Sequence, residues 1–158
     1  MNTWQQALAR SPATGAAAGI AAVAAIALLG RRDSGSALAP VNAATHVVAG
    51  DAAGLVERAT LRHTLPGLAI NLGAGLWWAL VFEKLFGEQV DQHGAAAAAL
   101  GGAATAGLAF LVDYRLLPPR LSPGWELRLS KRSLLTSLGA MGAGLALGAV
   151  LQRRARLP

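Results

Sequence analysis

An uncharged run over residues 64–82 constrains this chain more than any other feature of its sequence. A helix rises about 1.5 Å per residue, so a run of about 20 residues matches the roughly 30 Å thickness of a bilayer's hydrocarbon core. Arg62 and His63 come directly before the run, and Glu83 and Lys84 come directly after it. The run therefore predicts a membrane-spanning helix with charged residues at both ends.

Three similar runs lie elsewhere, and together the four predict spans at about residues 11–30, 64–82, 94–112 and 133–152. The 158 residues are 54 % hydrophobic and 14 % charged, whereas a typical soluble domain is about 25 % charged. Four spans of about 20 residues leave room for loops and tails but for no separate soluble domain. The expected fold is all-α, a polytopic transmembrane bundle of four helices that forms one membrane domain over residues 1–158.

The first apolar run has a second interpretation, a secretory signal peptide, because Ala37 and Ala39 give the small-x-small pattern of a cleavage site. Its apolar part is long for a signal peptide, and Arg31 and Arg32 follow it directly. Pro40 comes after the position of the cut and disfavours cleavage. We therefore favour a retained span.

The connections between the spans differ in length. Residues 1–10 are predicted to form a tail and residues 83–93 a short acidic loop. The first loop, residues 31–63, is the longest, and we expect it to form one or two short helices, at the interface or against the bundle. Within it, Asp51 is placed to cap a helix that begins at Ala52. The sequence leaves open whether residues 37–56 enter the bilayer.

Small residues recur at helical spacing on each span. Such residues let helix backbones approach closely, and this packing drives helix association in lipid, where the hydrophobic effect between helices is absent. The pattern predicts a tight bundle without a wide pore. The glycines that define it are Gly15, Gly19, Gly67, Gly75, Gly102, Gly144 and Gly148.

The net charge of +6 raises the question of a nucleic-acid partner. The basic residues, however, lie in pairs beside the apolar runs, and no basic stripe with interleaved aromatic residues is present, so nucleic-acid binding is not expected. Arginine and tryptophan at these positions are typical anchors at the membrane surface. The predicted anchors are Arg31, Arg32, Arg132, Arg153, Trp77, Trp78 and Trp125.

Orientation follows from the lysine and arginine residues on each side. Loops one and three carry more of them than the opposite side, whose middle loop is acidic. The positive-inside rule therefore places loops one and three in the cytoplasm, although the arginine-rich C-terminus opposes this assignment.

Few polar residues are candidates for chemistry. The histidines do not form a His-x-x-x-His pair, so a metal site would need residues distant in sequence to converge. The best such group is His46 with Asp51, joined by Glu57 or His63, and it is either a metal or proton-handling site or a set of loop hydrogen bonds. We favour hydrogen bonds, and no cofactor is expected.

Two polar residues belong to the spans themselves. Asp113 ends the apolar face of the third span, where an ionised carboxylate needs a partner. It is either a proton or ion site or a helix-end anchor paired with an arginine such as Arg115, and we favour the anchor. Asn71 lies in the middle of the second span, where an amide is expected to hydrogen-bond to another helix.

Catalytic motifs do not stand out. The glycines of residues 142–148 superficially resemble a dinucleotide-binding loop, but no strand precedes them and they lie inside a span. The chain has no Gly-x-Ser-x-Gly elbow, no phosphate-binding loop and no cysteine. We therefore expect a protein that is not an enzyme.

Two loop segments carry a family resemblance: PVNAATHVVAGDAAG, residues 40–54, and DYRLLPPRLSPGWELRLSKRS, residues 113–133. They resemble corresponding loops in a family of small uncharacterised four-span inner-membrane proteins of proteobacteria. The resemblance implies a bacterial inner-membrane location but no activity.

These features together favour a role in interaction, assembly or membrane organisation, with the lipid bilayer and either a membrane-protein partner or a second copy of the chain as partners. The alternative is a small proton or ion transporter or channel. Four spans are few for a carrier, so it would act as an oligomer. The polar residues available to it are His46, His63, Asn71 and Asp113.

Overall fold

A computed structural model describes residues 1–156, which are mostly helical and contain no strand. Four helical spans are long and apolar enough to cross a membrane: α1 (Trp4–Ser34), α4 (Thr64–His93), α5 (Ala95–Leu111) with its continuation to Leu116, and α6 (Lys131–Arg156). The short helical segments between them are α2 (Ala39–Ala43), α3 (His46–Ala49), η1 (Asp51–Leu55), η2 (Val112–Leu116), η3 (Pro119–Leu121) and η4 (Trp125–Leu127). The predicted all-α bundle of four membrane-length helices is confirmed.

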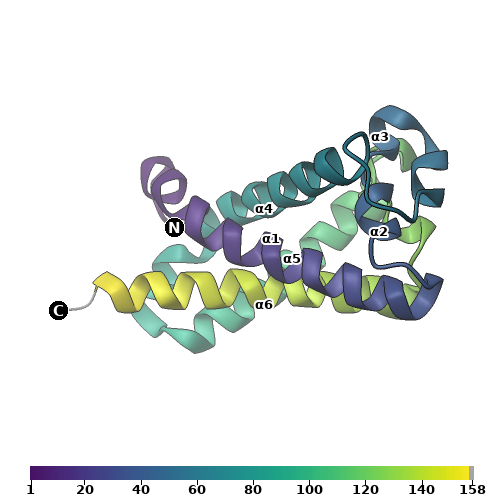
Figure 1. The fold of residues 1–158 in the computed structure, drawn as a ribbon. Helices are drawn as coiled ribbons and strands as arrows, with labels where there is room; N and C mark the ends of the chain where they lie inside the picture. Colours follow the sequence, from purple (N-terminus) through teal and green to yellow (C-terminus); the bar gives the residue numbers. More distant parts are fainter. Residues whose placement is uncertain (157–158) are drawn as a thin grey trace.

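Helix α1 is the centre of the bundle, with α4 on one side and α6 on the other (Figure 1). Helix α5 packs mainly against α6 and also contacts α4, to which it is joined at Gly94. Gly94 has a φ of 66°, a backbone conformation that glycine adopts without strain. The short helices α2 and α3 gather at the other end of the bundle (Figure 1).

The predicted tail and the predicted acidic loop are both helical. Helix α1 begins at Trp4 because Thr3 and Gln6 form a reciprocal capping box there. Helix α4 continues to His93 because its polar end has intramolecular partners: Glu88 pairs with the N-terminal amine of Met1, and Asp91 pairs with Arg10. These pairs stabilise helix where the sequence alone indicated loop.

The close helix contacts occur at glycines. A Cβ atom at Gly102 would lie 2.3 Å from the carbonyl oxygen of Gly142, so α5 and α6 meet backbone to backbone. Gly15 and Gly19 of α1 lie against α4, while Gly144 and Gly148 of α6 lie against α1. Gly67 differs from these, because its close neighbour is the carbonyl oxygen of Val41 in α2 and not a residue of a long helix.

Loops one and three fold together over one end of the bundle, and we call residues 35–63 and 117–130 the roof. Asn42 of α2 is buried and holds the first loop by donating to the carbonyl oxygens of Val56 (2.7 Å) and Arg58 (3.2 Å). Its own amide oxygen accepts a hydrogen bond of 2.8 Å from the hydroxyl of Thr64 at the start of α4. One asparagine thus ties the first loop to the second span.

The first loop contains short helices, as expected, but Asp51 has a different role from the predicted helix cap. The residue before η1 is Gly50, and Asp51 lies inside this single 3₁₀ turn without capping it. The turn ends at Leu55, because the backbone is extended at Val56, whose carbonyl oxygen accepts a hydrogen bond from Asn42.

Candidate functional site

A crevice of about 550 Å³ lies between α4, η2 and the roof. Its wall on α4 includes Ile70, Gly73 and Trp77, and residues of α6 such as Met141 also line it. Most of its lining is apolar, and the polar side chains that reach it are those of Asn71, Asp113 and Ser122. A space of this size falls in the range of small-molecule sites, roughly 300–1,000 Å³.

The crevice lies where the helical span of α5 ends beside α4. At this end of α5, the backbone widens into the π turn η2, and Pro118 and Pro119 then stop the helix. Gly73 leaves the opposite wall without a side chain, and a Cβ atom there would meet nothing within 4 Å. The crevice is therefore bounded by a broken helix on one side and by a bare backbone on the other.

Asp113 is partly buried on η2 and contributes a carboxylate to the crevice. The expected arginine partner is absent within residues 1–156, where none of the ion pairs includes Asp113. Arg115 instead lies over the ring of Phe110, 5.8 Å from its centroid. The buried indole of Trp78 is the side chain that interacts with the Asp113 carboxylate.

Asn71 connects α4 to the roof. Its amide oxygen accepts a hydrogen bond of 2.9 Å from the indole nitrogen of Trp125, and its amide nitrogen donates to the Gly67 carbonyl at 2.7 Å. The expected partner was another spanning helix, whereas the actual partner is a buried residue of loop three. Both polar atoms of the Asn71 amide are therefore already occupied.

The tryptophans divide into two groups, which corrects part of the anchor prediction. Trp78 and Trp125 are 5 % and 4 % exposed, so they pack inside the protein and do not anchor it at a membrane surface. Both residues line the crevice from within the protein. Trp77 is 60 % exposed and also lines the crevice.

The predicted basic anchors lie at the helix ends. Arg31, Arg32 and Arg132 are exposed, and Arg153 donates to the carbonyl oxygen of Asp91 at 3.1 Å. The first three are positioned to meet lipid headgroups or solvent, whereas Arg153 also joins α6 to the end of α4.

No protein-family model, curated protein or solved structure matches the chain. The chemistry of its sites follows from their own residues.

His46 and Asp51 come together in the roof, with 3.3 Å between His46 Nδ1 and Asp51 Oδ1. The other ring nitrogen of the buried His46 lies 2.9 Å from the carbonyl oxygen of Ser122, so His46 joins loop one to loop three. His63 is not part of this pair and contacts Thr60 instead. Within residues 1–156, no three His, Asp or Glu side chains lie close enough together to hold a metal ion.

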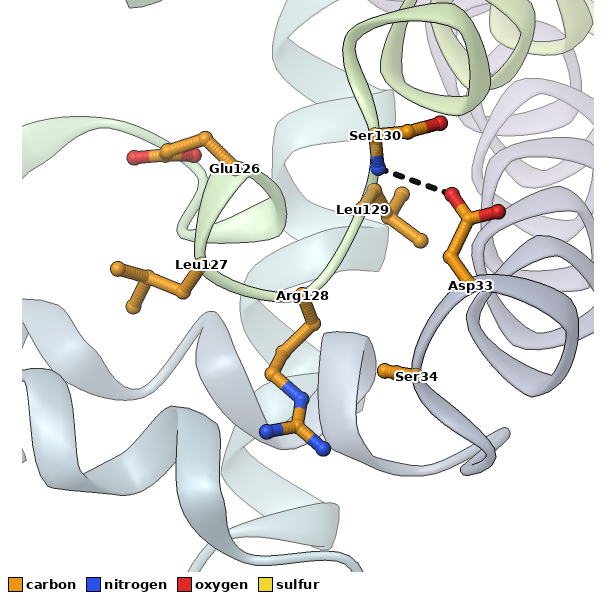
Figure 2. Close-up of a pocket in the computed structure, with 7 residues that line it drawn as sticks. All are labelled: Asp33, Ser34, Glu126, Leu127, Arg128, Leu129 and Ser130. Atoms are coloured by element: carbon orange, nitrogen blue, oxygen red, sulfur yellow. Dashed lines mark hydrogen bonds between the residues drawn. The ribbon is translucent and has the colours of Figure 1, made fainter.

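A second hollow, of about 520 Å³, lies on the outside of the roof where α1 ends and α6 begins. Figure 2 shows Asp33 directed at the backbone nitrogen of Ser130, which donates to it at 2.9 Å. Arg128 points away from Asp33 (Figure 2) and pairs with Glu57 of loop one. Asp33 supplies negative charge at the N-terminus of α6, so this hollow has a structural explanation.

Glu83 is a buried carboxylate that the sequence analysis treated only as the flank of a span. It is 2 % exposed and accepts a hydrogen bond of 2.6 Å from the hydroxyl of Thr14 on α1. Gln152 of α6 donates to the same hydroxyl at 2.6 Å. These three residues, which we call the Glu83 network, join three helices through polar side chains.

The signal for Glu83 was present in the sequence. The four-residue spacing of Gly67, Asn71 and Gly75 continues through Ala79 to Glu83, and all five are buried. Residues at this spacing share one face of a helix, so the stripe continued past the apparent end of the span.

Proposed function

We propose that this is a multi-pass protein of a bacterial inner membrane whose role is interaction within the bilayer, and that it binds a small apolar molecule in the crevice. The crevice is the observation that supports this proposal. At contacts such as Gly102 and Gly142 the helices meet at backbone distance, so the space of about 550 Å³ departs from this close packing.

The lining of the crevice resembles that of a ligand-binding site. Ligand sites are typically apolar with a few polar groups that fix orientation. The crevice combines apolar walls, exposed Trp77 and the partly buried carboxylate of Asp113. Its volume suits a small molecule or one acyl chain better than a complete helix of another protein.

The inner-membrane location is supported by the resemblance of the roof segments to loops of proteobacterial inner-membrane proteins. The distribution of lysine and arginine supports a cytoplasmic roof. In this orientation a ligand enters the crevice from the cytoplasmic half of the bilayer.

Site-specific photocrosslinking in native membranes tests the proposed role. A benzophenone amino acid at Ile70, on the crevice wall, is expected to give a discrete small-molecule adduct detectable by intact mass. The control position is Leu147 of α6, which is 57 % exposed and lies outside the crevice lining. Identical phospholipid adducts at both positions would contradict the proposal. A protein-sized adduct at Ile70 would instead support an assembly role with a partner or a second copy.

Proton or ion transport is the second candidate, and the burial of Glu83 within a membrane-length helix favours it. Ionisable residues inside spanning segments often mark ion pathways. On α4, however, the buried residues between Asn71 and Glu83 are Gly75, Trp78, Ala79 and Phe82, which offer no polar side chain for a path other than the Trp78 indole. Proton flux into proteoliposomes that is abolished by Glu83→Gln would favour transport over the proposed binding role.

A further inference from the structure

We propose that the crevice selects a lipophilic cation, a molecule with one positive charge among apolar groups, and that Asp113 supplies the opposite charge. This inference rests on the proposed binding role of the crevice and specifies its ligand class. The observation behind it is a carboxylate that faces an apolar cavity and has no basic partner within residues 1–156.

The Asp113 carboxylate interacts with the indole N–H of Trp78, but within residues 1–156 it has no positively charged partner. The charge that acts on it from the roof is that of Glu126, also a carboxylate. Arg115 is close in sequence but lies over Phe110. An ionised carboxylate in an apolar region is costly unless a positive charge approaches it, so the crevice is complementary to a cation and repels an anion.

The tryptophans add a second reason for a cation. The face of an indole ring attracts a positive charge within about 6 Å of its centroid, and this attraction strengthens when water is excluded. Trp77 and Trp78 are consecutive in α4, and both contribute to the crevice wall that also includes Asp113. A carboxylate and aromatic rings in one apolar cavity are suited to an ammonium or phosphonium group with apolar substituents.

An inorganic cation fits the crevice poorly. Hard metal ions need about six oxygen ligands, and the crevice offers few that are free. The Asn71 oxygen accepts a hydrogen bond from Trp125, and the single hydroxyl proton of Ser122 is directed to the Glu126 carboxylate or the Pro119 carbonyl. A bulky organic cation needs no such shell, because its charge is spread among apolar groups.

A zwitterionic phospholipid also fits poorly. Its ammonium group is accompanied by a phosphate, which would lie near both Asp113 and Glu126 and be repelled by them. The preferred ligand therefore has a net positive charge.

Two ions of the same shape and opposite charge test this inference directly. We would measure saturable binding of tetraphenylphosphonium and of tetraphenylborate to the full chain in an uncharged detergent, by equilibrium dialysis. The wild-type protein is expected to bind the cation at least about tenfold more tightly than the anion, a difference of about 1.4 kcal/mol. Asp113→Asn should remove this preference, whereas Asp51→Asn, the same change at an exposed roof residue, should keep it.

The results of this binding experiment distinguish a failure of the cation inference from a failure of the proposed apolar-binding role. Equal binding of both ions, or a cation preference that survives Asp113→Asn, would overturn the inference while leaving a crevice that binds apolar molecules. Absence of saturable binding of either ion would also overturn it, and photocrosslinking at Ile70 would then decide the binding role independently.

A second variant covers the case in which Asp113→Asn does not fold. Gly73→Leu places a side chain in the open part of the crevice, where a Cβ atom has no neighbour within 4 Å. It should weaken cation binding by at least about tenfold while the protein elutes and unfolds like the wild type. Unchanged binding by a folded Gly73→Leu variant would overturn the inference.

Discussion

Glu83 and Asp113 lie at opposite ends of the bundle, and the surroundings of their two carboxylates differ. Glu83, near the connection between α4 and α5, is 2 % exposed and accepts a hydrogen bond from Thr14. Asp113, where α5 ends under the roof, is only partly buried, faces the crevice and has no ion pair within residues 1–156. Both lie beside apolar helix faces, yet Glu83 accepts a hydrogen bond from another long helix, and its partner Thr14 of α1 in turn accepts one from Gln152 of α6.

This difference indicates a structural role for Glu83 and a ligand-binding role for Asp113. A buried polar group that is satisfied by its own protein stabilises one arrangement of the helices. A carboxylate left without a basic partner beside an open cavity has capacity for a ligand. The Glu83 network therefore explains how three helices are held together, and Asp113 explains what the crevice can recognise. The predictions below test this division.

The largest effect is expected from a pair of glycines two residues apart on α4. Gly75→Val puts a Cβ atom 2.9 Å from the Gly19 backbone of α1, whereas Gly73→Val points into the crevice. Overpacking at Gly75 should reduce the free energy of unfolding by about 3 kcal/mol, and Gly73→Val should leave it nearly unchanged. Unfolding in a mixed-micelle denaturant titration measures both. Equal losses would contradict the distinction between a packed and an open face of α4.

The second prediction compares the two carboxylates. Glu83→Ala removes the acceptor of Thr14 and leaves a cavity between three helices, so it should cost about 2 kcal/mol. Asp113→Ala should cost less, about 1 kcal/mol, because within residues 1–156 the only interaction that it removes is the one with the Trp78 indole. The same unfolding titration applies, with circular dichroism as a check on helix content. A larger loss for Asp113→Ala would assign that residue a structural role.

The third prediction concerns the bond between α4 and the roof. Trp125→Phe keeps a ring in the core but leaves the buried oxygen of Asn71 without its donor, so we expect a loss of about 1 kcal/mol. Trp4→Phe is the matched control, because Trp4 is 61 % exposed at the start of α1. If the two variants unfold alike, the Asn71–Trp125 hydrogen bond does not stabilise the roof.

The smallest effect is expected at the outer hollow. Asp33→Asn removes the negative charge that faces the N-terminus of α6 but keeps an oxygen for Ser130. The melting temperature should fall slightly, by less than for Trp125→Phe, and the fall should shrink in high salt because exposed charges are screened. An unchanged or raised melting temperature would show that Asp33 does not stabilise the junction of α1 and α6.

The fold class could be predicted because membrane spans are recognisable in sequence as long uncharged apolar runs. Length and hydropathy located all four long helices, and the glycine spacing located the residues at which they approach one another. The helix ends were less predictable. Segment 83–93 looked like an acidic loop, but its charges are satisfied by Arg10, by Arg156 and by the N-terminus, which are distant in sequence.

The candidate site was only partly predictable for the same reason. Asp113 and Asn71 stood out as polar residues on apolar faces, and His46 was correctly placed beside Asp51. The partners of Asp113 and Asn71 could not be predicted, because both are distant along the chain. The partner of Asn71 is Trp125 in loop three, and that of Asp113 is the Trp78 indole on another helix. Burial of Trp78 and Trp125 depends on the same tertiary packing, so sequence position alone placed them at the membrane surface.

The most direct test of the crevice as a cation site uses the four tryptophans as probes. We would label the protein with 5-fluorotryptophan, assign the fluorine resonances with single Trp→Phe variants, and titrate tetraphenylphosphonium. The crevice residues Trp77, Trp78 and Trp125 should shift saturably, while Trp4, outside the crevice lining, should not. The shifts should be absent with tetraphenylborate. Equal shifts at all four tryptophans, or none at Trp77 and Trp78, would contradict the account.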